Sequence, residues 1–161
     1  MSTDVSESTD ATGLETVLVG VGGRDDDRVD TLVDAVRDVA APSDATVVIA
    51  HVFDTDSYRD AVERLLDTEG GEIGPDELAA RMSVTREISD RLEADSIDCV
   101  PRATTGTSGN GIVSLAEDVD ADLVIVGGRQ RSPTGKAIFG STAQEVMLNA
   151  PCPVTFVRDR G

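Results

Sequence analysis

The chain carries five short apolar runs, rich in valine, separated by longer amphipathic stretches. The runs are "TVLVGVG" (residues 16–22), "ATVVIAHVF" (45–53), "DCVPRAT" (98–104), "DLVIVGG" (122–128) and "PVTFVR" (153–158). Runs that are apolar at nearly every position are typical of strands buried on both faces of a parallel sheet. The pattern therefore predicts five parallel strands. Pro101, within the third run, favours a place near an edge of the sheet for that strand.

Between the runs, apolar residues recur at helical spacing. They predict helices over residues 29–39, around 61–66, over 78–92 and 112–119, and from about residue 141. Strands that alternate with helices indicate a single-domain α/β fold, Rossmann-like, with an open five-stranded parallel sheet in the order 3-2-1-4-5 and helices on both faces. Such sheets bind ligands beyond the carboxyl ends of the strands, where the strand order reverses. Here that point lies between the first and fourth strands, which end at Gly22 and Gly128.

The length and charge of the chain limit its organisation and its partners. We expect residues 1–13, which are polar and acidic, to form a disordered tail, and residues 14–161 to form one domain. The formal net charge is -17, and such a charge repels nucleic acid and anionic membranes. The start of the chain has no signal-peptide pattern, and no apolar run is long enough for a membrane span, so we expect a soluble, cytoplasmic protein.

The acidic composition also has a particular character. Thirteen of the 14 basic residues are arginine, aspartate outnumbers glutamate, and only four residues are aromatic. This usage resembles that of proteins from salt-loving archaea, whose acidic surfaces stay soluble in concentrated salt. We therefore expect a halophilic source.

Several residues that could carry chemistry have simpler interpretations. Cys99 and Cys152 lack the spacing of metal ligands, and we expect two buried free thiols. The lone histidine, His51, is expected to be a satisfied side chain at a strand end. The acidic stretch 25–27 could hold Mg²⁺ bridging to a phosphate, but we favour an N-cap and first helical turn for it.

The most distinctive segment is "GGRQRSPTGKAIFGST", residues 127–142. Residues 123–144 contain no acidic side chain, whereas Arg129, Arg131 and Lys136 bring three positive charges together. Gly127 and Gly140 leave the backbone open, and a helix that starts near Ser141 would offer amides to a phosphate. In the alternative interpretation, Ser141 and Gln144 form a capping box that uses the same amides without any ligand. On these residues alone both interpretations stand.

The stretch 127–141, preceded by "ADLVIVG" and followed by "NAPCPVTFV", resembles the universal stress protein family. The likeness extends over residues 15–158, and its last third is the most specific. It implies a five-stranded parallel fold of the adenine nucleotide alpha hydrolase-like type, commonly dimeric through the last strand. One branch of the family binds ATP in the crevice described above, and the family has no common chemical reaction.

The resemblance also implies a binding site. Gly127, Gly140 and Ser141 would approach the ribose and phosphates, and Thr142 and Ala143 would offer backbone amides. Val52 would lie against adenine, with Val21 nearby at the end of the first strand. Two residues depart from the motif: Gln130 replaces its second glycine, and Gly22 stands where ATP-binding members present an aspartate. Gln130 and Arg129 can still donate hydrogen bonds to phosphate oxygens.

The sequence thus leads to one main hypothesis and two others. The first is a homodimeric stress-response sensor or regulator that binds ATP or a related adenine nucleotide, with Mg²⁺ accompanying the nucleotide, an unknown protein partner, no catalytic residue assigned and at most slow hydrolysis. The second is a protein-interaction module of the same fold that binds no nucleotide. The third is a hydrolase that uses His51 with Ser132 or Ser141.

Overall fold

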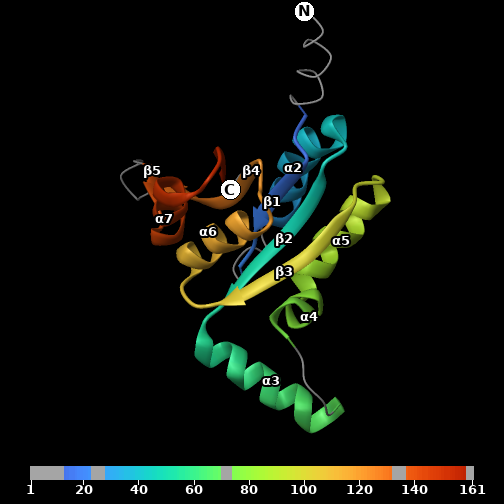
Figure 1. Cartoon of the computed structure of the whole chain (residues 1–161), viewed down its shortest axis with the longest axis vertical. Coiled ribbons are helices and arrows are strands. Elements are labelled where there is room, and N and C mark those ends of the chain that lie inside the picture. Colours follow the sequence, from blue (N-terminus) through green and yellow to red (C-terminus); the bar gives the residue numbers. More distant parts are fainter. Residues whose placement is uncertain (1–12, 23–27, 70–73, 132–136, 159–161) are drawn as a thin grey trace, which may run out of the picture.

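One sheet, with helices on both faces, organises the chain (Figure 1). The structure is a computed structural model that describes residues 13–22, 28–69, 74–131 and 137–158, with the backbone alone at 65–69, 128–131, 137–139 and 158. The elements are β1 (Thr16–Gly20), α2 (Val29–Ser43), β2 (Thr46–Phe53), α3 (Thr55–Glu69), α4 (Pro75–Ala80), α5 (Ser83–Ala94), β3 (Cys99–Thr105), α6 (Ser108–Asp118), β4 (Leu123–Arg131), β5 (Ala137–Phe139), α7 (Ser141–Asn149) and β6 (Val154–Arg158). The predicted tail lies, apart from Gly13, outside the described residues.

Five of the strands are parallel. β3, β2, β1 and β4 are neighbours in that order, and β6 pairs with β4. In the register, Val17 of β1 lies between Val47 of β2 and Leu123 of β4. The predicted parallel sheet with order 3-2-1-4-5 is therefore confirmed, with β6 as its fifth parallel strand.

A sixth strand was not predicted. The apolar run predicts a fourth strand that ends at residue 128, but β4 continues to Arg131 and pairs antiparallel with the three-residue β5. The register between β4 and β6 is irregular between Gly127 and Arg129. Part of the glycine-rich segment is therefore held by sheet hydrogen bonds, and residues 132–136, which include Lys136, lie outside the described part of the chain.

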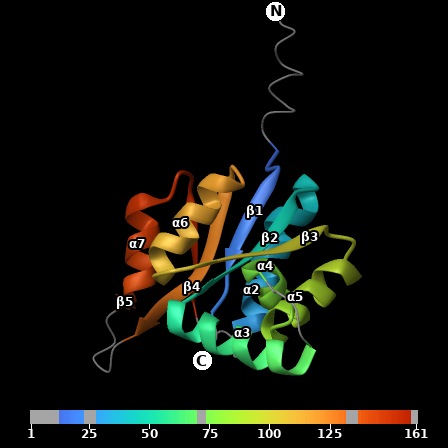
Figure 2. The same ribbon diagram turned by 60° about the horizontal axis from the view of Figure 1, so that its bottom comes forward.

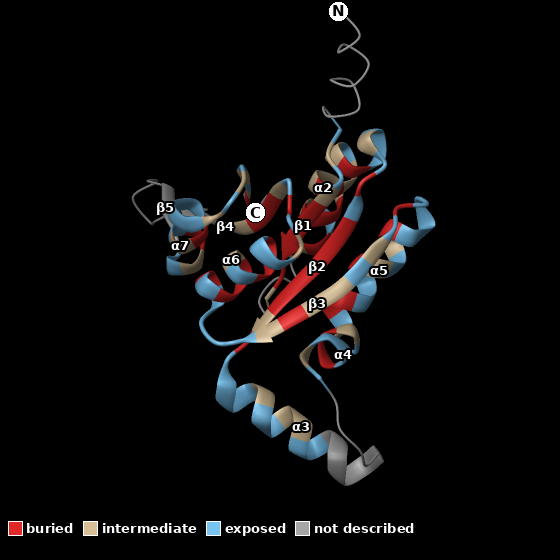
Figure 3. Cartoon of the chain, viewed as in Figure 1, coloured by how far each residue is buried: buried red, intermediate tan, exposed pale blue. Residues whose placement is uncertain are grey.

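Side chains alternate between the two faces of the sheet and build two cores. Val17 and Val19 of β1, and Val21 just after it, belong to the cluster that includes the buried residues of α2 and α5. Leu18 belongs to the cluster under α6 and α7. The buried colouring of β1 and β2 in Figure 3 reflects this two-sided packing, which explains why their sequences are continuously apolar.

Residues 78–92, predicted as one helix, form parts of two. Met82 has an extended backbone (φ -71°, ψ 140°) and separates α4 from α5. Leu78 of α4 packs with Phe53 in a small cluster near the end of β2, whereas Ile88 of α5 packs in the main core with α2. One straight helix would not bury its apolar residues in both clusters. The continuous apolar spacing over residues 78–92 therefore wrongly indicated a single helix.

β3 is the edge strand that Pro101 predicted. Ala103 donates its backbone N–H to Asp76 Oδ1 of α4 at 2.6 Å, away from β2. Residues two apart along a strand direct their N–H groups to the same side, so the N–H that Pro101 lacks would also lie on this outer edge of β3. α4 contacts β3 along this edge, and Figure 2 shows α3 at the side of the molecule to which the arrows of β1 and β4 point.

Candidate functional site

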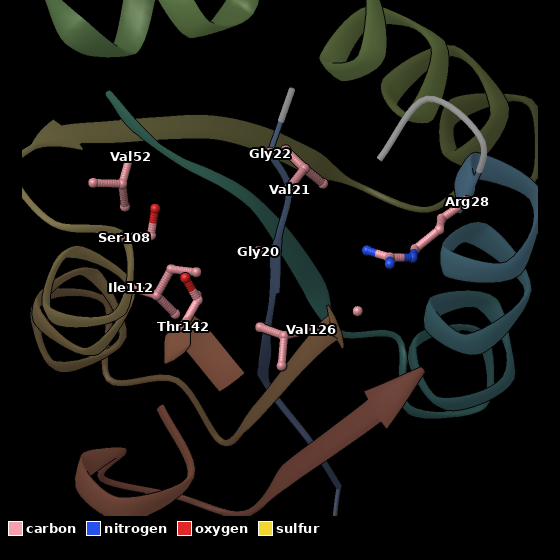
Figure 4. A pocket seen from close by; sticks show the side chains of 10 residues that line it. Gly20, Val21, Gly22, Arg28, Val52, Ser108, Ile112, Val126 and Thr142 are labelled. Carbon is pink, nitrogen blue, oxygen red and sulfur yellow. The ribbon is translucent and has the colours of Figure 1, made fainter. Parts of the chain in front are cut away.

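A cavity of about 190 Å³ lies at the carboxyl ends of β1 and β4, where the strand order reverses (Figure 4). This is the position predicted for a ligand. The residues that line it come from three strands, from the two residues after β1, from two helices and from the residue before α2: Gly20, Val21, Gly22, Arg28, Val52, Ser108, Ile112, Val126, Gly127 and Thr142.

One wall of the cavity is apolar because two glycines let α6 approach the sheet. A Cβ atom on Gly20 would lie 2.6 Å from Ile112 Cδ1, and one on Gly111 would lie 2.5 Å from Val52 Cγ2. Both distances are far below van der Waals contact. The two glycines therefore set the positions of Val52 and Ile112, and the resulting wall is suited to a flat apolar group.

The polar groups come from the beginnings of helices. Ser108 is the first residue of α6, Thr142 is the second residue of α7, and Arg28 directly precedes α2. Figure 4 shows Ser108 and Thr142 on one side of β1 and Arg28 on the other. Amides at helix N-termini carry partial positive charge, so the starts of α6 and α7 favour an anion between them.

Close packing of α6 against α7 holds these two helix starts together. A Cβ atom on Gly109 would lie 2.4 Å from Glu145 Cβ, so the helices approach at a glycine. Gly109 is itself buried. The distance between Ser108 and Thr142 is therefore fixed by backbone packing.

Arg28 reaches into the cavity across Gly127. A Cβ atom on Gly127 would lie 3.0 Å from Arg28 Cδ and 3.2 Å from Nη1. A side chain at position 127 would therefore press on the arginine. Gly127, predicted to let the backbone approach a ligand, also leaves room for this guanidinium.

The predicted site residues fall into three groups. Val21, Val52, Gly127 and Thr142 line the cavity. Gly140 and Ser141 lie exposed at the beginning of α7, and Ala143, two residues after Ser141, is buried. The last group, Arg129 and Gln130, extends β4 beyond Gly127 opposite Phe139 and Ile138 of β5, and their side chains lie outside the described part of the chain.

The capping box of Ser141 and Gln144, the alternative to a phosphate site, does not form. Gly140 is the N-cap of α7 (φ -69°, ψ 168°) and Ser141 is the first helical residue, so the cap carries no side chain. The backbone N–H of Gln144 donates to the Gly140 carbonyl as part of the helix. The box requires serine one position earlier, so this interpretation was wrong by one residue.

His51 is a satisfied side chain, as predicted. Its Nδ1 lies 2.8 Å from the Val21 carbonyl oxygen, and its ring packs edge-on against Phe53 at 4.3 Å. His51 shares the face of β2 that carries Val47 and Ile49, which is covered by α2 and α5, whereas α7 covers the other face. The structure therefore does not bring His51 to Ser141, and Ser132 lies outside the described residues.

Both cysteines are free and half-buried, so the prediction of full burial was wrong. Partial burial raises the pKa of each thiol, and at Cys99 a hydrogen bond with Ser89 opposes the rise. The neutral thiol is therefore favoured near neutral pH at both positions.

Arg28 and Ser108 were missed as site residues. Ser108 lies in "TSGNG", just beyond the third strand, and this position at a carboxyl edge could have indicated it. Arg28 carries no comparable signal, because it stands six residues after Gly22 and the intervening residues 23–27, including the acidic triplet, are outside the described chain. Among the residues that the structure describes, no group of three or more histidine, cysteine or acidic side chains could hold a metal ion.

A helix that crosses a bilayer needs about 20 consecutive, mostly apolar residues, and this requirement applies to the helices of the described residues. Within those residues, none is both long and apolar enough to cross a bilayer.

Comparison with known proteins gives one consistent family. The model of the Universal stress protein family matches residues 13–158. A universal stress protein from Mycolicibacterium smegmatis is 25% identical over 114 residues, which cover 70% of this chain and 88% of the relative.

Solved structures of the same family share the fold. A universal stress protein from Archaeoglobus fulgidus is 25% identical, with a TM-score of 0.62 over 89% of this chain and 98% of that one. A universal stress protein solved in complex with cAMP is 26% identical, with a TM-score of 0.63 over 91% and 98%. A further Archaeoglobus fulgidus structure, a complex with dAMP, is 19% identical and has a TM-score of 0.57 over 89% and 97%.

Proposed function

The chain belongs to the universal stress protein family, and from this premise we propose that its cavity binds an adenine nucleotide. The observation that carries the proposal is the cavity itself. Its apolar wall of Val52, Ile112 and Val126 lies beside the beginnings of two helices and an arginine. Small-molecule sites combine such apolar walls with a few placed polar groups. The related protein that was solved with cAMP supports the ligand class.

In the proposed complex the base lies against Val52 and Ile112, and the phosphates lie near the first turn of α7. Gly140 leaves open space there, because a Cβ atom built on it meets nothing within 4 Å. The exposed helix start gives phosphate oxygens access to backbone amides and to the Thr142 hydroxyl. ATP with Mg²⁺ is the form we propose, and the metal would neutralise part of the phosphate charge.

The wider role that we propose is that of a cytoplasmic, homodimeric stress-response sensor or regulator of halophilic type. β6 pairs with β4 in the sheet and brings its other edge to the end opposite β3. An edge strand of this kind can pair with a second copy of itself. The covered edge at β3, where Asp76 and Pro101 lie, makes β6 the better candidate. A monomer mass by light scattering in molar KCl would contradict the dimer.

Calorimetric titration of ATP with Mg²⁺ in molar KCl tests the nucleotide proposal. The informative variant is Gly140→Val, because the protein itself has space for the new side chain, which would occupy the place proposed for a phosphate. We expect saturable binding by the parent protein and a loss of about tenfold or more in affinity for the variant.

Gly74→Val is the matched control. Gly74 is the N-cap of α4 with nearly the same backbone (φ -85°, ψ 169°), and a Cβ atom there also meets nothing within 4 Å. Equal loss in both variants would indicate a general effect of valine at a helix N-cap. If the parent protein gives no binding heat and releases no nucleotide on denaturation, the nucleotide proposal fails and the interaction-module hypothesis takes its place.

A further inference from the structure

We propose that Arg28 is a specificity-determining residue of the cavity: its guanidinium binds an anionic group of the ligand, so that the site selects nucleotides over uncharged nucleosides. The inference rests on the proposed function and deepens it. Neither the shape nor the apolar wall of the cavity determines the charge of the ligand. We infer that Arg28 does.

The first argument is charge. Of the described residues that line the cavity, Arg28 is the only one with a charged side chain; the others are glycine, valine, isoleucine, serine and threonine. The whole chain has a formal net charge of -17, which repels a polyanionic ligand at long range. A cation placed inside the cavity opposes that repulsion where the ligand binds. An uncharged ligand would gain nothing from it.

The second argument is position. Arg28 reaches the cavity from the start of α2, on one face of the sheet, while Ser108 and Thr142 begin α6 and α7 on the other (Figure 4). An anionic group over the ends of β1 and β4 would thus meet donors from both sides. Guanidinium matches phosphate geometry through two parallel N–H groups, which a lysine does not provide.

The third argument is the space left for the side chain. Arg28 Cδ and Nη1 lie 3.0 and 3.2 Å from the position of a Cβ atom on Gly127. Any residue but glycine at 127 would move the arginine by a few tenths of an ångström or more. Gly127 therefore leaves room for the guanidinium to lie against β4.

The test compares AMP with adenosine, which differ only by the phosphate, in calorimetric titrations at one KCl concentration. For Arg28→Gln we expect AMP affinity to fall by about tenfold or more and adenosine affinity to stay within about twofold. Arg28→Lys should recover part of the loss. Arg37→Gln, on the exposed side of the same helix, is the control, because it changes net charge equally at a distance from the cavity.

The outcomes separate the two proposals. If the parent protein binds AMP and Arg28→Gln binds it equally well, the role of Arg28 is wrong and nucleotide binding stands. If Arg28→Gln loses AMP and adenosine to the same extent, the residue only maintains the fold, and this too overturns the inference. If the parent protein binds neither compound, nor ATP, both proposals fall. Circular dichroism and a thermal midpoint for each variant establish that it is folded.

Discussion

At the scale of single residues, Asp54 shows how one carboxylate starts a helix. It directly precedes α3 and accepts hydrogen bonds from the Ser57 backbone N–H at 2.8 Å and from the Ser57 hydroxyl at 2.7 Å. These hydrogen bonds hold the pKa of Asp54 below its ordinary value of 3.8. The bond from the Ser57 hydroxyl has the larger effect, and the bond from the Ser57 backbone N–H follows. A carboxylate with a lowered folded-state pKa stabilises the fold above its ordinary pKa, and that contribution is lost as pH falls through the lowered value.

We therefore expect the first turn of α3 to fray in acid as Asp54 becomes protonated. The Ser57 amide proton resonance, followed by NMR from neutral pH to about pH 2, should shift with a midpoint below the ordinary aspartate value. Asp54→Ala should abolish this titration, and Asp60→Ala, further along the same helix, should leave it intact. A midpoint at or above the ordinary value would contradict the cap.

Single residues also show where sequence reasoning reached the site and where it stopped. Val52 and Thr142 were predicted from the resemblance, and both line the cavity. Arg28 was not predicted, because its position in the cavity depends on where α2 begins and on glycine, which has no side chain, at position 127. The alternative that made Ser141 the N-cap was wrong, because the helix already begins at Ser141 and its N-cap is Gly140.

At the scale of elements, α4 protects the edge of the sheet. Asp76 accepts the Ala103 N–H of β3, and its Oδ2 lies 3.3 Å from Arg102 Nε.

The variant Asp76→Ala tests this role, because it removes the acceptor of the Ala103 N–H, which points away from the sheet. We expect a loss of about 1 kcal/mol in the free energy of unfolding. Glu77→Ala, which breaks only the exposed contact with Arg81, is the control and should cost less. Urea denaturation of the three proteins measures the difference, and equal stabilities for the two variants would refute the role of Asp76.

Strands that are buried on both faces were predicted well. β1, β2 and the first part of β4 are of this kind, and because nearly every residue in them is apolar, the apolar runs indicated the strands directly. The division between α4 and α5 escaped detection because both helices bury apolar residues at the same spacing against different clusters. The three-residue β5 is too short to carry a periodic signal, and its pairing depends on β4 extending to Arg131.

At the scale of the whole molecule, the net charge of -17 on 161 residues makes stability depend on salt. Repulsion among surface carboxylates opposes the folded state, and counterions screen it. We expect the thermal midpoint to rise by roughly 5 °C or more between dilute buffer and 0.5 M KCl, a change on the order of 1–2 kcal/mol for a chain of this size. Calorimetry over a KCl series measures the rise. Because counterions screen the repulsion, most of the rise in thermal midpoint should occur at low KCl concentrations. A midpoint independent of KCl would show that repulsion is unimportant.

The cavity draws its polar side chains from the beginnings of helices, namely Arg28, Ser108 and Thr142, while the two cores lie further along the same helices. The polar contacts to a ligand are thus encoded outside the two cores, whereas the apolar wall formed by Ile112 and Val126 belongs to one of them. A lineage could exchange any of these three residues and acquire a new ligand without repacking a core. Gly20 and Gly111 have no such freedom, because each fixes how closely α6 lies against the sheet. The architecture therefore permits rapid divergence of specificity on a frame that itself evolves slowly.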